Sequence, residues 1–351
     1  MLENLEELNL SEHDEMEGEI PIGIGELSSL RILNLQCTRI CRIQRTINML
    51  HHLQTLNLRD CHVIEVLPEF PTSLTSLLLE SNSLLSVPNL SNLTNLVELL
   101  LSDGSRNTGK SNLITGCNLW WIGRLSRLKR LDLNLLNFPT PSELASLSDL
   151  EELTLSHLAL ETLEKLPSSL LRLIVKFFRI RRAELLPSCL ILSNLSTLEF
   201  CSGEVEDIPL DGLPLLENLT VHDCKLLQRL SIPLELRKLR QACVACCPEL
   251  VMIEVGGLLK SMESFSILRC VSLRRVGGLN ELESLKYLTV RECTSLESLF
   301  DASCTNIADD CHVDIQVCGD FIKDFAASYQ HEIYSKRYGE MNFLDTSNKS
   351  T

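Results

Sequence analysis

The chain has 351 residues, of which 44% are hydrophobic and 23% charged, and its formal net charge is −15. This composition is ordinary for a folded protein with a sizeable core. Nine acidic residues precede the first basic residue, Arg31, so this end of the chain repels phosphate and nucleic acid is not an expected partner. No stretch reaches the roughly 18 consecutive apolar residues of a membrane span, and the N-terminus lacks the basic start of a signal peptide. We therefore expect neither membrane insertion nor secretion.

A six-residue pattern, L-x-x-L-x-L, recurs along the chain with apolar residues at its first, fourth and sixth positions. Thirteen copies begin at Leu5, Leu30, Leu53, Leu74, Leu96, Leu128, Leu150, Leu170, Leu195, Leu216, Leu239, Met262 and Leu285. Successive copies start 20 to 25 residues apart, except for one step of 32 residues that begins at Leu96. This spacing is typical of leucine-rich repeats.

Each copy is expected to form a short strand, because alternate side chains of an extended segment point inward to a common core. Stacked copies bury together what one copy cannot bury alone. Prolines punctuate the return segments, which favours short 3₁₀ or extended turns over long helices. The sequence therefore predicts an α/β solenoid: a curved leucine-rich repeat array of about 13 repeats, with a parallel concave sheet and an irregular convex side.

We expect residues 1–300 to form this solenoid, with a loop insertion at about 103–126 inside the one long step. Residues 301–351 leave the repeat pattern and are expected to form a C-terminal cap and a mobile tail. Four apolar residues of this segment recur at helical spacing: Ile322, Phe325, Tyr329 and Ile333. A single apolar stripe is typical of a helix that covers the open edge of a last strand.

The insertion contains "GSRNTGKS", residues 104–111, which fits the phosphate-binding pattern G-x-x-x-x-G-K-[ST]. A working phosphate loop needs a following helix and a later strand that ends in a magnesium-binding aspartate. Here Gly116 interrupts the expected helix, and the sequence returns at once to leucine-rich repeats. We therefore expect a polar loop that binds no nucleotide. Trp120 and Trp121 follow, and at least one is expected to pack on the adjacent repeat.

Several cysteines occupy the ninth position of their repeats, where a small inward side chain ends the strand: Cys61, Cys224, Cys247, Cys270 and Cys293. The last four are 23 residues apart and should stack as a ladder. Parallel strands hold neighbouring Cβ atoms farther apart than the roughly 3.8 Å of a disulfide, so reduced thiols and a cytosolic location are expected. The "CVACC" segment has no second cysteine or histidine pair nearby, so we predict no metal site there, with Cys243 on the concave face.

No Ser-His-Asp or Cys-His arrangement can be read from the sequence, so we predict no enzymatic activity and no cofactor. The segment "KFFRIRR", residues 176–182, mixes basic and aromatic residues. Its two interpretations are a phosphate-contacting patch and a solvated return loop that places Phe178 in the core. We favour the second, because Phe178 occupies the ninth position of its repeat.

The side chains best placed to bind a partner flank the buried leucines, since they project from a rigid sheet at fixed spacing. On the middle strands these are Arg130, Asp132, Asn134, Glu152, Thr154, Arg172, Lys176 and Glu199. Their charges alternate in sign, which suits a protein surface better than a nucleic-acid backbone. The other interpretation is a solvated, mixed-charge face without a partner.

The repeats "LENLTVHDCKLL", "FSILRCVSL" and "LKYLTVRECTSL" resemble the leucine-rich repeat region of plant intracellular disease-resistance proteins. These are nucleotide-binding, leucine-rich immune receptors, and the chain is most similar to the branch with an N-terminal Toll/interleukin-1-receptor-like domain. The resemblance implies a cytoplasmic or nuclear module of innate immunity whose partner is a pathogen effector, a host protein or the receptor's own switch domain.

The chain departs from that family in having neither the signalling domain nor the nucleotide-binding domain, so ATP binding and NAD cleavage are not implied for it. We expect it to be the C-terminal part of a larger receptor or the product of a truncated gene. A second possible function is that of a general leucine-rich repeat adaptor, which presents a client to a ligase, phosphatase or kinase complex. An adaptor should carry a docking motif outside the repeats, and none is apparent.

Overall fold

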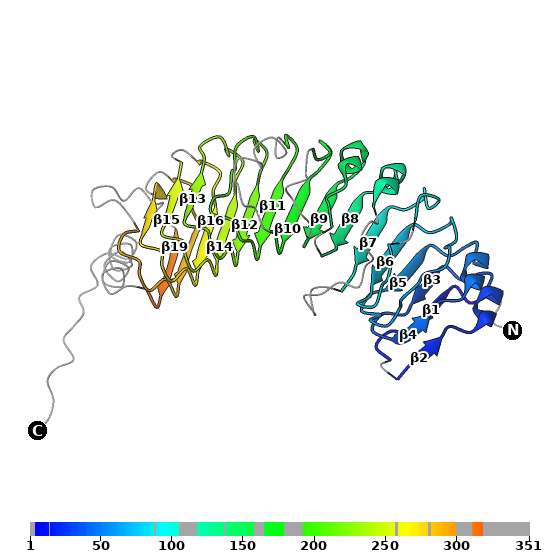
Figure 1. The fold of residues 1–351 in the computed structure, drawn as a ribbon. Helices are drawn as coiled ribbons and strands as arrows, with labels where there is room; N and C mark the ends of the chain where they lie inside the picture. The colour runs from blue at the N-terminus through cyan, green and yellow to red at the C-terminus, as the bar shows by residue number, and fades with distance from the viewer. Residues whose placement is uncertain are drawn as a thin grey trace, which may run out of the picture.

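The computed structural model describes residues 4–13, 15–87, 89–104, 118–136, 138–157, 165–178, 192–256, 259–279, 282–299 and 311–318. Within these ranges the chain winds into a curved array whose strands lie side by side from one end to the other (Figure 1). The predicted parallel-sheet solenoid is confirmed.

One sheet of fourteen strands runs through the array, and all of its pairings are parallel. Its strands are β1 (Glu7–Asn9), β3 (Ile32–Asn34), β5 (Thr55–Leu58), β6 (Ser76–Glu80), β7 (Glu98–Ser102), β8 (Arg130–Asn134), β9 (Glu152–Ser156), β10 (Arg172–Lys176), β11 (Thr197–Cys201), β12 (Asn218–His222), β14 (Gln241–Ala245), β16 (Ser264–Leu268), β18 (Tyr287–Arg291) and β19 (His312–Gln316). The first thirteen coincide with the thirteen predicted copies.

The apolar positions of each repeat build one continuous core. In the β8 repeat, for example, Leu128, Leu131 and Leu133 are buried, and Leu131 lies in register between Leu99 and Leu153 of the adjacent strands. Burying one leucine stabilises the fold by about 1.5 to 3 kcal/mol. Every repeat contributes several such side chains, so the pattern that predicted the strands also supplies the stabilising free energy.

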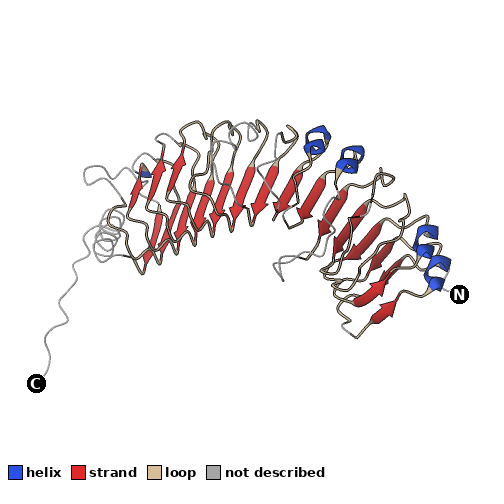
Figure 2. Cartoon of the chain, viewed as in Figure 1, coloured by secondary structure: helices blue, strands red, loops and turns tan. Residues whose placement is uncertain are grey.

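Within the described residues, the outer side carries short elements only, as the prolines predicted. Four 3₁₀ helices lie along it (Figure 2): η1 (Ile22–Glu26), η2 (Arg45–Met49), η3 (Trp120–Arg124) and η4 (Ser142–Ser146). Two small parallel sheets, which the sequence analysis did not anticipate, comprise β2 (Glu17–Glu19) and β4 (Arg39–Arg42), and β13 (Arg229–Ile232), β15 (Met252–Val255) and β17 (Arg275–Gly277). Parts of the return path are therefore more regular than expected.

A residue in the left-handed backbone region follows most strands of the large sheet, at the eighth position of the repeat. Examples are Asp223, Cys246 and Arg269, with φ between 53° and 55°. The backbone N–H of Cys246 donates to the carbonyl oxygen of Leu268 in the next repeat at 2.8 Å. This conformation is uncommon for residues with a Cβ, but here it extends the hydrogen-bonded ladder past the strand and turns the ninth residue into the core.

The sheet continues beyond residue 300, where the repeats were predicted to end. β19 pairs in parallel with β18, and Cys311, Val313 and Cys318 are buried beneath it. The remaining predictions for the C-terminal segment, including the stripe from residue 322 to 333, lie outside the described residues. Only two of the three apolar positions are filled in the β19 repeat, which made it hard to recognise.

One member of the tryptophan pair, Trp121, packs in the core, as predicted for at least one of the two. Trp121 in η3 is 2% exposed and belongs to the core, whereas Trp120 is 44% exposed with the Arg124 guanidinium 5.2 Å from its ring centroid. Most of the stretch that resembles a phosphate-binding loop, residues 105–111, lies outside the described residues.

Candidate protein-binding surface

The predicted binding residues come from four consecutive strands, β8 to β11, and the sheet arranges them in rows. One row contains Arg130, Glu152 and Arg172, which are register partners on β8, β9 and β10. A second row contains Asp132, Thr154 and, one strand beyond Ile174, Glu199. Neighbours within a row are one strand spacing apart, about 4.8 Å. The structure therefore brings most of the predicted residues together on one surface. The charges alternate in sign along the first row, whereas both charged residues of the second row are acidic.

Ion pairs across the strands fix several of these side chains. Arg130 Nε lies 3.4 Å from Oε1 of Glu98 on β7, and the Arg172 guanidinium contacts the Glu199 carboxylate across the β10–β11 pair. All four groups are partly exposed, and such pairs contribute about 0 to 1 kcal/mol each to stability. Glu98 was missed by the sequence analysis, although it occupies the same repeat position as Arg130. A hollow of about 140 Å³ is lined by Arg59, Leu78, Glu98, Leu99, Leu100, Arg130, Leu131, Asp132, Glu152 and Thr154.

Asn134 does not belong to this surface, which corrects the prediction. Its side chain is 1% exposed, and its Nδ2 donates to the Oγ of Ser102 at 3.0 Å. Ser102 and Ser156, its register partners at the ends of β7 and β9, are buried as well. At the last position of these strands the chain turns toward the core, so a polar side chain there holds adjacent strands together. Lys176, at the same position of β10, is half-buried.

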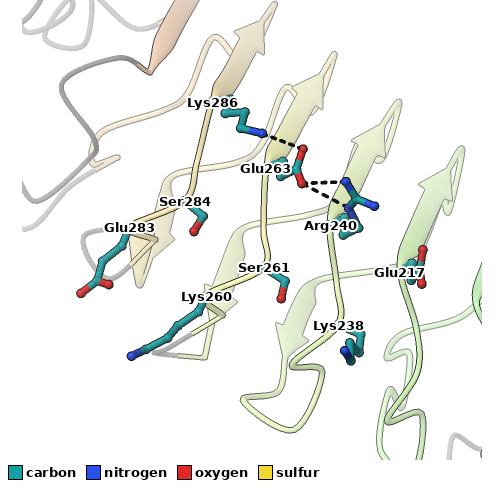
Figure 3. A pocket seen from close by; sticks show the side chains of 9 residues that line it. All are labelled: Glu217, Lys238, Arg240, Lys260, Ser261, Glu263, Glu283, Ser284 and Lys286. Atoms are coloured by element: carbon teal, nitrogen blue, oxygen red, sulfur yellow. Dashed lines mark hydrogen bonds and ion pairs between the residues drawn. The ribbon is translucent and has the colours of Figure 1, made fainter.

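A second charged surface, which was not predicted from the sequence, lies on the segments that lead into strands β12, β14, β16 and β18. Glu263 accepts from Arg240 at 2.8 Å and from Lys286 at 3.2 Å, so three successive repeats are joined by one carboxylate (Figure 3). Arg240 and Lys286 hold the pKa of Glu263 below its usual range. Lys238, Lys260 and Glu283 also line this hollow of about 460 Å³. The sequence did contain a signal for this surface: the second position of successive repeats alternates in charge, from Glu217 through Arg240 and Glu263 to Lys286.

The cysteine ladder forms as predicted, with free thiols. Cys224, Cys247, Cys270 and Cys293 are fully buried and unpaired, and Cys318 on the β19 repeat extends the series. Each thiol lies within hydrogen-bonding distance of the carbonyl oxygen two residues before it, for example 3.4 Å from Cys247 Sγ to Ala245. Hydrogen bonding to the Cys224 thiol raises the pKa of Cys247 to about 12, so Cys247 stays protonated at neutral pH.

Cys243 of "CVACC" lies where the repeat register predicted. Cys243 is half-buried in the middle of β14, and its pKa is raised by burial. No group of three or more possible metal-ligating side chains occurs within the described ranges. Phe178 is also buried, against Phe200 with ring centroids 5.4 Å apart, in agreement with its assignment to the core.

Thiol labelling of the native chain is expected to follow this burial. Cys41 is the most exposed cysteine in the described residues and should react first, Cys243 more slowly, and the buried ladder thiols only when the fold opens. Peptide mapping after timed alkylation would measure the order. Labelling of Cys270 as fast as Cys41 in the native protein would contradict the ladder.

Comparison with known proteins supports the fold, and one segment of the chain is similar in sequence to a plant resistance protein. No family model matches the sequence. A segment of 76 residues, 22% of the chain, is 41% identical to TMV resistance protein N of Nicotiana glutinosa, but it spans only 7% of that protein. Searching the described residues shows no helix that is both long and apolar enough to span a bilayer.

Two solved structures have the same architecture. A leucine-rich repeat protein of Leptospira interrogans superposes with a TM-score of 0.51 at 17% identity, over 94% of this chain and 89% of that one. The functional domain of InlJ from Listeria monocytogenes, which includes a cysteine ladder, gives 0.57 at 15% identity, over 90% of this chain and 64% of that one. At this identity the likeness concerns the fold alone. Together with the periodic sequence and the parallel sheet, it shows that the chain has a leucine-rich repeat fold.

Proposed function

We propose that the chain is a non-catalytic protein-recognition module that binds a protein partner on the surface of β7 to β11. The observation that carries the proposal is the row of Arg130, Glu152 and Arg172, in which charges of alternating sign project from a rigid sheet at fixed spacing. A mixed-charge surface complements another protein better than it complements a polyanion. Because the strands are held by ladder hydrogen bonds, binding requires little ordering of the backbone.

The biological setting that we propose is plant innate immunity, in the cytoplasm or nucleus. The partner would be a pathogen effector, a host protein or the switch domain of a receptor. This is supported by the short segment similar to TMV resistance protein N and by the repeat sequences that resemble disease-resistance proteins. The alternative is an adaptor that presents a client to a ligase, phosphatase or kinase complex; it would be favoured if such an enzyme copurified with the chain.

Affinity purification from plant tissue with matched charge variants tests the proposal. The double variant Arg130→Glu, Arg172→Glu makes the row acidic throughout, whereas Arg237→Glu is a single substitution of the same kind at an exposed residue away from β7 to β11. A partner bound by this surface should be retained by the wild type and by Arg237→Glu. Its binding to the double variant should fall about tenfold or more, since about 1.4 kcal/mol changes affinity tenfold.

Circular dichroism spectra that match the wild type would establish that the variants fold. A partner retained equally by all three proteins would show that recognition does not use this surface.

A further inference from the structure

The charged hollow beside the segments that lead into β12, β14, β16 and β18 is basic on balance, although the whole chain has a net charge of −15. Its side chains form rows that cross the repeats (Figure 3). The row nearest the strands contains Lys286, Glu263, Arg240 and Glu217, the next contains Ser284, Ser261 and Lys238, and the outermost contains Glu283 and Lys260. Because each row takes residues from successive repeats, the hollow is a feature of the stacked repeats and not of one loop.

The central carboxylate of the hollow, that of Glu263, is already compensated by its neighbours. Its Oε1 accepts from Arg240 Nη2 at 2.8 Å, and its Oε2 accepts from Lys286 Nζ at 3.2 Å. Both oxygens are engaged with cations, so Glu263 presents little free negative charge to an incoming ligand. Arg240, Glu263 and Lys286 together contribute one positive charge.

The middle of the hollow is rich in hydrogen-bond donors that have no acceptor. Lys238 and Lys260 are exposed, and neither forms an ion pair within the described residues. The hydroxyls of Ser261 and Ser284 are half-buried, and in the described part of the chain they make no side-chain hydrogen bond. Each ammonium can donate three hydrogen bonds and each hydroxyl one. This donor set is satisfied by an anion with several acceptor oxygens.

A phosphate monoester fits these donors better than a carboxylate does. It carries three acceptor oxygens and a charge of about −1.5 to −2 at pH 7, whereas a carboxylate has two oxygens and a single charge. Lysine binds phosphate as a compact charge on a flexible stem, so Lys238 and Lys260 can approach one phosphoryl group from adjacent repeats. The hollow, at about 460 Å³, also has room for the residues beside that group.

Two exposed carboxylates restrict what else can bind. Glu217 comes from the β12 repeat and Glu283 from the β18 repeat, so they flank the set of donors, and neither has an ion pair among the described residues. A nucleic acid carries a phosphate at every nucleotide and is repelled by these carboxylates. A peptide with one phosphoryl group and a basic residue beside it can pair with them instead.

We propose that this hollow binds a phosphorylated segment of a partner protein, in which a basic residue lies next to the phosphorylated one. Lys238, Lys260 and the two serine hydroxyls hold the phosphoryl group, and Glu217 and Glu283 pair with the basic side chains. The binding is non-covalent. The site is separate from the surface of β7 to β11 and does not depend on the function proposed for that surface.

Three short peptides test the proposal with the full chain. The first is "GKASAKG" phosphorylated on its serine, the second is the same peptide without phosphate, and the third is phosphorylated "GEASAEG", which has acidic neighbours. Isothermal titration should show binding of the first peptide, with the other two weaker by about tenfold or more. Binding of the first should strengthen as the pH rises from about 5 to about 7, because the phosphate loses its second proton with a pKa of about 6.

Variants of the chain locate the binding. The double variant Lys238→Gln, Lys260→Gln should weaken it about tenfold or more. The matched control Lys165→Gln, Lys225→Gln removes the same charge at two exposed lysines outside the hollow and should leave binding unchanged. Circular dichroism spectra that match the wild type would establish that both variants fold.

Several results would overturn the proposal. These are equal binding of the unphosphorylated peptide, undiminished binding to the folded Lys238→Gln, Lys260→Gln variant, and equal losses in the two double variants. A single-stranded oligonucleotide serves as the polyanion control. If it binds as tightly as the first peptide, the hollow attracts phosphate charge of any source and does not select a phosphorylated protein segment.

Discussion

Replacing Phe265 with alanine is expected to lower the free energy of unfolding by about 3 to 5 kcal/mol. Phe265, the second residue of β16, is fully buried and lies in register between Ala242 and Leu288. Ala242 is one of the smallest side chains at this inward position, so the phenyl ring fills space that a leucine fills in other repeats. Removing the ring leaves a cavity that neighbouring strands, held by ladder hydrogen bonds, cannot close.

Urea denaturation followed by circular dichroism would measure the loss. The matched control is Tyr287→Ala on β18, because Tyr287 is also aromatic but 56% exposed; its effect should stay within about 1 kcal/mol. Similar losses for the two variants would mean that the inward face of β16 is not the packed core that the structure shows.

Truncation after residue 300 is expected to give a chain that is markedly less stable than the chain truncated after residue 318. The shorter chain loses β19, which covers the edge of β18 and buries Val313 beside Leu288. Losing the burial of Cys311, Val313 and Cys318 should lower the stability by about 2 to 5 kcal/mol, and the uncovered edge invites association with other chains.

Thermal denaturation and light scattering of the two truncated chains would test this difference. The chain that ends at residue 318 keeps every described strand and serves as the control. If the two truncated proteins have equal melting temperatures and are both monomeric, β19 contributes nothing to the end of the array.

The strands were predictable because the same three apolar positions recur in thirteen repeats, and each time their side chains must be buried. Cys224 and Cys247 could be placed in the core from the repeat register alone. β19 escaped recognition because its leading positions are polar, and only Val313 and Ile315 keep the pattern. The pattern is hard to recognise in a repeat when one of its apolar positions is polar. The strand still forms, because its backbone hydrogen bonds to the adjacent strand do not depend on that side chain.

The candidate surface was predictable as a set of rows but not residue by residue. Alternation places Arg130 and Asp132 on the same side of β8, and the structure agrees. The same alternation placed Asn134 beside them, yet it is buried, because the strand ends there and the chain turns inward.

The constant spacing of the repeats from Leu216 to Leu285 makes each 23-residue segment an interchangeable unit. The strands β12, β14, β16 and β18 meet in the same register at every step, and their cysteines occupy equivalent sites. Excising residues 239–261 would bring Met262 to the place of Leu239 and leave the same kind of strand contact on both sides. This part of the solenoid can therefore be shortened or lengthened by whole 23-residue repeats without changing the contacts between neighbouring repeats.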